Sequence, residues 1–218
     1  MGTFIVQGGN SLKGEISPQG SKNEALQIIC ACLLTPEKIT VRNIPDIADV
    51  NSLIDLLSCL GVRIRRKSRS VAVFEAADIN LEYLRTDDFR IKSSGLRGSV
   101  MIVGPLLARY GKAYMPKPGG DKIGRRRIDT HLSGFRKLGA EFDYDFSETC
   151  FKIGASSLKG TFILLDEASV TGTANIIMAA MFARGRTTIY NAACEPYIQQ
   201  LCKMLVLMGA EIRGIGSN

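Results

Sequence analysis

Residues 131–144 read His131-Leu132-Ser133-Gly134-Phe135-Arg136-Lys137-Leu138-Gly139-Ala140-Glu141-Phe142-Asp143-Tyr144. The spacing of apolar residues predicts a helix over 131–138, and the alternation after Gly139 predicts a strand over 140–144. Glycine is the usual left-handed residue that ends a helix. The same ending recurs as Leu60-Gly61-Val62 and Met208-Gly209-Ala210, at spacings of about 70 to 80 residues. The chain therefore carries one structural unit three times.

Each repeated ending is preceded by a more apolar helix and a short strand. The apolar helices are predicted at 25–34, 95–110 and 173–183, and the strands that follow them at 39–43, 112–115 and 187–191. The helices that end at the repeated glycines cover 50–60, 131–138 and 198–208, and their strands cover 62–65, 140–144 and 210–213, with one more strand at 71–74. We expect three helix–strand–helix–strand repeats to share one core in an α/β (α+β) domain. The first helix of each repeat should be buried and the second should border solvent.

Two short strands are predicted before the first repeat, at 4–7 and 12–18, with a glycine-containing turn between them. No proline-, glycine- or serine-rich linker divides the rest of the chain. The 218 residues can form one substantial core.

Composition limits the class of function. Hydrophobic residues make up 45% and charged residues 22% of the chain, as in ordinary globular proteins. No apolar stretch is long enough to span a membrane, and the start lacks a secretory pattern. Six cysteines and one histidine show no metal-ligand spacing, so we expect no metal, no cofactor and a cytoplasmic location. The net charge of +7 favours an anionic partner.

Much of the positive charge lies near one long connection, residues 116–131. It reads Pro116-Lys117-Pro118-Gly119-Gly120-Asp121-Lys122-Ile123-Gly124-Arg125-Arg126-Arg127-Ile128-Asp129-Thr130-His131. Prolines and glycines interrupt helix and strand patterns here, and long connections in compact domains are often binding loops. The alternative is an ordinary solvated basic loop.

The predicted starts of the buried helices are also suited to anions. They carry Ser21-Lys22-Asn23, Ser93-Ser94-Gly95-Leu96-Arg97 and Ser169-Val170-Thr171-Gly172-Thr173. Free backbone N–H groups and the positive end of the helix dipole attract anions at such starts. Each set alone fits simple helix caps or surface charges. Because they occupy corresponding positions in three repeats, we expect them to converge with the loop on one site.

With these residues the chain resembles the N-terminal half of the UDP-N-acetylglucosamine enolpyruvyl transferase family. The resemblance covers nearly the whole chain and rests on residues 20–26, 96–99, 104–109, 118–131, 166–173 and 191–196. It implies an inside-out α/β barrel of three repeats, one of two such barrels that close on the substrates. Residues 21–218 would form the first barrel, and residues 1–20 would pair with the second, C-terminal barrel.

The resemblance implies transfer of the enolpyruvyl group of phosphoenolpyruvate to the 3-hydroxyl of UDP-N-acetylglucosamine, with release of phosphate. This is the first committed step of peptidoglycan precursor synthesis. Lys22 and Arg126 would bind the phosphate and carboxylate of phosphoenolpyruvate, and Asp121 would stand at the loop position that protonates its C3. The remaining implied contacts are Asn23 and Arg97 near the sugar, Arg126, Arg127, Ile128, Asp129 and Thr130 along the uridine, and Ser169, Val170 and Thr171 on the diphosphate.

Three positions depart from the family pattern. Asp121 replaces the usual cysteine, which the epoxide fosfomycin alkylates in the family, Arg127 replaces a usual proline, and Glu167 replaces a common lysine. Because the second barrel would supply further site residues, the 218-residue chain alone should be inactive.

Two other functions remain open. A related shikimate-phosphate enolpyruvyl transferase would share the fold, although the loop motif argues against it. A non-catalytic module binding anions or nucleic acid could use the same basic face. Only Tyr110 and Tyr114 are aromatic near the cations, whereas single-strand binders interleave stacking aromatics, so no nucleic-acid partner is expected. No membrane partner is expected either, because no apolar stretch is long enough to span a membrane.

Overall fold

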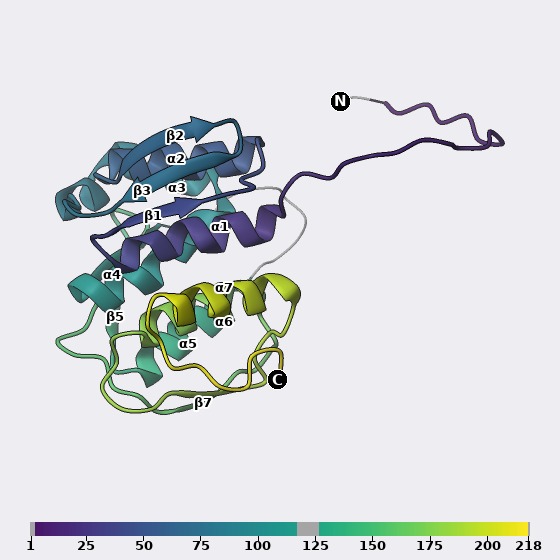
Figure 1. The fold of residues 1–218 in the computed structure, drawn as a ribbon. Coiled ribbons are helices and arrows are strands. Elements are labelled where there is room, and N and C mark those ends of the chain that lie inside the picture. The colour runs from purple at the N-terminus through teal and green to yellow at the C-terminus, as the bar shows by residue number, and fades with distance from the viewer. Residues whose placement is uncertain (1–2, 117–126, 218) are drawn as a thin grey trace.

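The computed structural model describes residues 3–116 and 127–217. Three repeats follow one another along the chain (Figure 1). The first contains α1 (Lys22–Ala31), η1 (Cys32–Leu34), β1 (Lys38–Val41), α2 (Ala48–Cys59), β2 (Arg63–Ser68) and β3 (Val71–Glu75). The second contains η2 (Leu81–Arg85), α3 (Asp87–Gly95), η3 (Arg97–Ile102), α4 (Val103–Tyr110), β4 (Lys112–Pro116), α5 (Asp129–Lys137), β5 (Glu141–Asp145) and β6 (Cys150–Gly154). The third contains β7 (Phe162–Leu164), α6 (Val170–Ala180), β8 (Thr188–Tyr190) and α7 (Pro196–Leu207).

The helices pack together in the middle and the sheets lie outside them. Helix α4 packs along α6, α5 also contacts α6, and α1 packs against α7 (Figure 1). The most apolar helices supply the centre of the core, where Ile29, Leu106 and Ile176 are fully buried. Their sequences are apolar on nearly every face, and only complete burial removes such surfaces from water. The predicted mixed α/β fold and the predicted buried helices are confirmed.

The repeated glycines have the predicted role. Gly61, Gly139 and Gly209 adopt φ angles of 106°, 97° and 106°, and each follows the end of a helix. This left-handed conformation is strained for residues with a Cβ atom, which explains why glycine recurs at the three junctions.

The sheets repeat less perfectly than the helices. The first two sheets have the orders β1-β3-β2 and β4-β6-β5, with all pairs antiparallel, whereas β7 and β8 form a parallel pair. The strand predicted at 210–213 is wrong, because these residues are irregular in the structure. In the first two repeats the corresponding segment pairs with the next strand in a hairpin, and within the described residues no such neighbour follows 210–213. A strand needs such pairing to satisfy its backbone groups.

In the second repeat, the segment that precedes the buried helix α4 differs from the prediction. The helix expected over 95–110 begins as the 3₁₀ segment η3 and becomes α-helical only at α4. The preceding helix α3, like β6 and β7, was not predicted. Its start carries a standard signal, because Thr86 caps it by accepting the backbone N–H of Phe89 at 3.2 Å.

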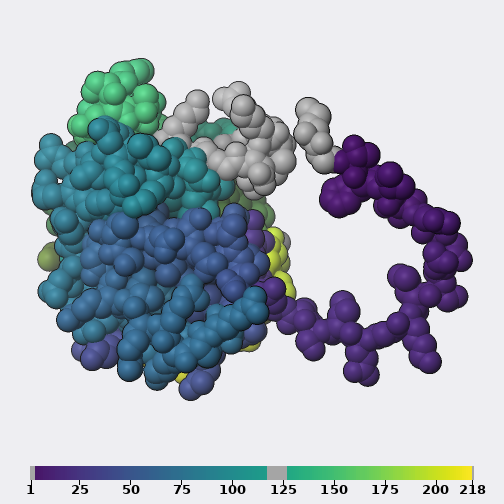
Figure 2. All heavy atoms as spheres, turned by 90° about the horizontal axis from the view of Figure 1, so that it is seen from above, coloured from purple at the N-terminus to yellow at the C-terminus, as the bar shows by residue number. Residues whose placement is uncertain are grey.

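The N-terminal residues form an extended arm. Residues 3–19 contain no helix or strand, so the strands predicted at 4–7 and 12–18 do not form in this chain. Figures 1 and 2 show the arm standing away from the body, and Phe4 and Leu12 are 96% and 97% exposed. At its base, Gln19 Oε1 accepts the backbone N–H of Asp46 at 2.9 Å. The arm carries apolar residues but finds no strand partner among the described residues.

One close approach fixes how α4 meets α6. A Cβ atom at Gly104 would collide with the backbone carbonyl of Asn175. The absence of a side chain therefore lets the two buried helices touch at this point.

Across the described parts of the chain, no helix has both the length and the apolar character needed to cross a membrane.

Candidate functional site

The start of α6 has the geometry of an anion site. Ser169 is the N-cap, with φ −73° and ψ 118°, and its Oγ accepts the backbone N–H of Gly172 at 3.2 Å. The backbone N–H groups of Val170 and Thr171 lie in the first turn, where no acceptor exists within the helix. Among residues 3–116 and 127–217 these two donors have no acceptor, and they lie at the positive end of the helix dipole.

The start of α5 lies directly beside the start of α6. Thr130 is buried, and the methyl group of its side chain packs against Gly172. Its hydroxyl donates to Glu167 Oε1 at 3.3 Å. The structure therefore brings together the segments 127–130 and 169–171, which the sequence predicted to share one site.

Behind these two helix starts lies a chain of buried hydrogen bonds. His131 Nε2 lies 3.1 Å from Thr171 Oγ1, and the His131 Nδ1 atom lies 3.0 Å from Asn175 Nδ2. The same Asn175 amide donates to the carbonyl of Val100 at 2.7 Å, while its Oδ1 accepts the backbone N–H of Gly104 at 2.7 Å. Asn175 thus joins the second and third repeats at the centre of the core.

These partners determine the protonation of His131. A backbone N–H can only donate and a carbonyl can only accept, so Gly104 and Val100 fix the orientation of the Asn175 amide. Its NH₂ group therefore faces Nδ1 of His131, which must be an acceptor. Burial, with a smaller contribution from the charge of Arg97, lowers the pKa of His131 to about 4. At neutral pH the ring is uncharged, carries its hydrogen on Nε2 and donates to Thr171.

Two predicted arginines approach the same region. Arg97 is the first residue of η3, and its Nη2 donates to the backbone carbonyl of Arg127 at 3.3 Å. Arg127 Nε in turn pairs with Asp129 Oδ2 at 2.7 Å, and this hydrogen bond raises the pKa of the Arg127 guanidinium. Arg127 is exposed and Arg97 is half-buried, so two guanidinium groups lie near the starts of α5 and α6, together with the carboxylates of Asp129 and Glu167.

Lys22 and Asn23 begin α1 and are both exposed. Lys22 Nζ forms an ion pair with Asp49 of α2, a partner that the sequence did not suggest. One turn later, the side chain of Leu26 packs against Gly98, next to Arg97. The first turn of α1 therefore lies beside η3, which places the predicted Lys22–Asn23 and Arg97 segments next to each other.

Some predicted positions are corrected or lie outside the description. Ser93 is buried near the end of α3, so the predicted helix start at 93–97 is wrong, and only the short 3₁₀ segment η3 begins there. Asp121 and Arg126 lie outside the described residues. The half-buried Ile128 is the N-cap residue of α5 and packs against the core.

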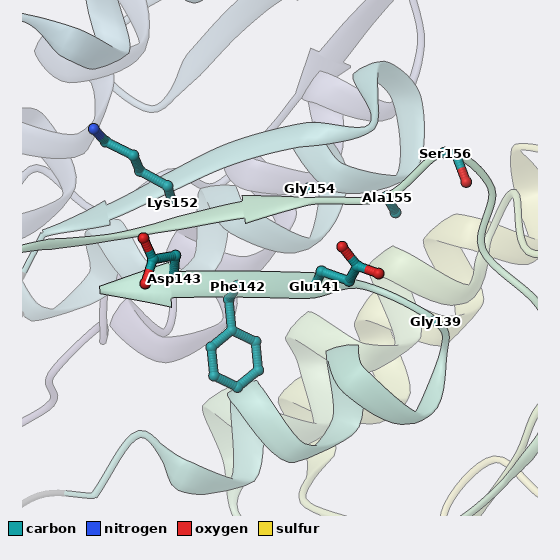
Figure 3. Close-up of a pocket in the computed structure, with 8 residues that line it drawn as sticks. All are labelled: Gly139, Glu141, Phe142, Asp143, Lys152, Gly154, Ala155 and Ser156. Carbon is teal, nitrogen blue, oxygen red and sulfur yellow. The ribbon is translucent and has the colours of Figure 1, made fainter. Parts of the chain in front are cut away.

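Two surface cavities lie elsewhere. A depression of about 440 Å³ lies beside β5 and β6, where Figure 3 shows Glu141 and Asp143 directed away from the side of β5 that carries Phe142. It includes Gly139, at the far end of α5 from Thr130. A second cavity of about 280 Å³ includes Arg109 and lies at the C-terminal end of α4. Neither contains a predicted site residue, and the described residues hold no cluster of three or more His, Cys, Asp or Glu side chains suited to a metal.

The sequence interpretation did not identify the His131–Asn175 pair as part of the site. The available signal was Asn175 itself, a polar residue within the otherwise apolar stretch 174–183. A buried amide requires partners, so such a residue indicates a polar contact between packed elements.

Curated proteins of known name resemble this chain over its whole length. A relative from Porphyromonas gingivalis named UDP-N-acetylglucosamine 1-carboxyvinyltransferase is 62% identical over 218 residues, which cover 100% of this chain and 50% of the relative. A protein of the same name from Borreliella burgdorferi is 44% identical over 218 residues, 100% of this chain and 49% of the relative. The chain thus spans about half the length of the curated relatives it matches.

Solved structures show the same fold. The enolpyruvyl transferase NikO from Streptomyces tendae matches with a TM-score of 0.78 and 17% identity, covering 97% of this chain and 50% of that one. An EPSP synthase from Acinetobacter baumannii matches with a TM-score of 0.69 and 16% identity, covering 93% of this chain and 45% of that one. The family model described as EPSP synthase (3-phosphoshikimate 1-carboxyvinyltransferase) matches residues 6–218, and the chain belongs to this family.

Proposed function

We propose that this chain is one barrel of an enzyme that transfers the enolpyruvyl group of phosphoenolpyruvate to the 3-hydroxyl of UDP-N-acetylglucosamine. Phosphate is released, and the reaction is the first committed step of peptidoglycan precursor synthesis. A cytoplasmic location and roles in cell shape and division follow from the same proposal. The names of relatives that are 62% and 44% identical over the whole chain support this acceptor.

The observation that carries the proposal is that the N-terminal ends of α5 and α6 lie side by side. The backbone N–H groups of Val170 and Thr171 at the start of α6 lie beside Thr130, and Arg97 donates to the backbone carbonyl of Arg127 nearby. A nucleoside diphosphate sugar needs such donors for its phosphates. In the proposed arrangement Ser169, Val170 and Thr171 hold the diphosphate, and residues 126–130 follow the uridine.

Phosphoenolpyruvate would bind between this region and the start of α1. Lys22 and Arg126 would contact its phosphate and carboxylate, with Asn23 and Arg97 toward the sugar. Asp121 would deliver a proton to C3 while the sugar 3-hydroxyl oxygen adds to C2 and gives its own proton to a base in the proposed second barrel. The resulting tetrahedral intermediate then expels phosphate and loses a proton from C3, which restores the carbon–carbon double bond. Asp49 forms an ion pair with the ammonium group of Lys22, so phosphoenolpyruvate bound at Lys22 would compete with Asp49.

The exposed arm and the proposed second barrel belong together. Residues 1–20 would form strands with that barrel, which gives their apolar side chains a partner. The second barrel would also supply the remaining site residues, so the 218-residue chain alone should bind ligand weakly and not turn over. Phosphate release by the purified chain, lost on Lys22→Ala, would contradict the assignment of this chain as an inactive half.

Acceptor choice is tested by calorimetric titration of the chain with UDP-N-acetylglucosamine and with shikimate 3-phosphate. We expect binding of the nucleotide sugar. Binding of shikimate 3-phosphate alone would support the activity named in the family model instead. Salt-sensitive binding of an oligonucleotide without binding of either acceptor would support a nucleic-acid module.

A further inference from the structure

The buried histidine has a geometry that suits a role beyond packing. His131 is 1% exposed, so it cannot contact a ligand outside the core. It nevertheless lies 3.1 Å from Thr171, a half-buried residue in the first turn of α6. This turn is the proposed diphosphate site, and the inference below rests on that proposed function.

In each hydrogen bond that links Asn175, His131 and Thr171, the donor and the acceptor can be assigned. Gly104 and Val100 orient the Asn175 amide, the amide donates to His131 Nδ1, and the ring therefore donates from Nε2. The Thr171 oxygen accepts this hydrogen. Its own hydroxyl hydrogen then remains to be donated, and among the described residues the structure shows no acceptor for it.

A threonine hydroxyl can rotate, and it can either donate to an acceptor or accept from a donor. A neighbouring donor removes part of this freedom, because the oxygen lone pair turns toward the donor and the hydrogen turns away. An anion offers only acceptor atoms. The hydroxyl hydrogen of Thr171 is thus already directed away from His131 and free to be donated before an anion binds.

We infer that His131 is a positioning residue for the diphosphate, which uses its Nε2–H to direct the Thr171 hydroxyl hydrogen toward a phosphate oxygen at the start of α6. Asn175 holds the ring in the required tautomer. Because Asn175 is anchored to η3 and α4, the arrangement also ties the proposed site in the third repeat to the second repeat.

The state of the ring can be read without any ligand. The chain has one histidine, so long-range ¹H–¹⁵N NMR of labelled protein reports His131 directly. We expect a hydrogen on Nε2, a bare Nδ1, and a changed Nε2 signal in Thr171→Val. A hydrogen on Nδ1 would overturn the inference, even if the chain binds the nucleotide sugar.

The effect of His131 on binding is measured by NMR titration with UDP-N-acetylglucosamine and with uridine, which lacks phosphate. Thr171→Val removes a hydrogen bond to a charged group and should weaken binding of the nucleotide sugar about 10- to 100-fold. His131→Leu should weaken it roughly 2- to 10-fold, because the hydroxyl must then be ordered on binding. His131→Gln, whose side-chain amide can replace the Nε2 donor, should restore most of the affinity. None of the three should change the affinity for uridine.

The double variant decides whether His131 acts through Thr171. We expect His131→Leu to cause no further loss in the Thr171→Val background, whereas additive losses, or equal losses for uridine, would overturn the inference. Should His131→Leu not fold, as judged by circular dichroism, His131→Gln and the NMR signal still decide. A parent chain that fails to bind UDP-N-acetylglucosamine would instead overturn the proposed function.

Discussion

The side-chain amide of Asn175 donates to Nδ1 of His131 across 3.0 Å inside the core. Both residues are almost fully buried, and they belong to α6 and α5. His131 lies in the first turn of α5, and Asn175 lies one turn beyond Thr171 in α6. We therefore expect stability and ligand binding to depend on the same few polar groups.

Stability should fall in mild acid because of His131. Its pKa is about 4 in the folded chain against an ordinary value of 6.5, so the unfolded state takes up the proton first. The contribution is fully present above pH 6.5 and is lost as the pH falls toward 4, a total of about 3 kcal/mol. Urea unfolding across this range should show the loss in the parent and not in His131→Gln. An equal loss in both proteins would contradict the assignment.

Two buried amides should respond oppositely to substitution. Asn175→Leu leaves the Gly104 N–H, the Val100 carbonyl and His131 without partners, which should cost roughly 3–6 kcal/mol of unfolding free energy. Gln27 is 1% exposed, and among the described residues its Oε1 has no partner. Gln27→Leu should therefore be neutral or stabilising by up to about 1 kcal/mol. Similar destabilisation by both substitutions would show that volume, rather than hydrogen bonding, dominates at these sites.

The N-terminal arm should contribute almost nothing to the stability of this chain. Residues 3–18 are all exposed, and a deletion of residues 1–18 keeps Gln19, whose side chain accepts the Asp46 N–H. We expect the unfolding free energy to change by less than about 0.5 kcal/mol. A larger loss would mean that the arm packs on the body in solution.

Arg126→Ala should weaken binding of UDP-N-acetylglucosamine by the chain about 10- to 150-fold, because it removes charge-assisted hydrogen bonds to the ligand. Arg136→Ala is the matched control. Its guanidinium lies over the ring of Phe142, 4.4 Å from the ring centre, and should not affect affinity. Equal affinities of parent and Arg126→Ala in calorimetry would count against the proposed site.

Asp121 should make the proposed full-length enzyme resistant to fosfomycin. A thiolate opens an epoxide readily and a carboxylate does so much less, so the parent should give no adduct in the presence of UDP-N-acetylglucosamine. Asp121→Cys should give one at the new cysteine, detected by mass spectrometry. An adduct on the parent loop, or an active cysteine variant that forms none, would refute the assignment of this position.

The sequence by itself determined the three repeats, the glycine ends of α2, α5 and α7, and the burial of the apolar helices. These features are local or periodic: a left-handed residue is needed where a helix stops, and a helix that is apolar on all faces must be buried. The sequence also indicated the Ser169 cap, since serine at a helix start is a local signal.

Only the tertiary structure decided which distant groups meet. No pattern in the sequence pairs Lys22 with Asp49, or Asn175 with His131 and Gly104, because such contacts depend on how helices from different repeats cross. The strands predicted in the arm and at 210–213 failed for the same reason. A strand is stabilised by its neighbour, and the presence of that neighbour is decided by the assembled fold.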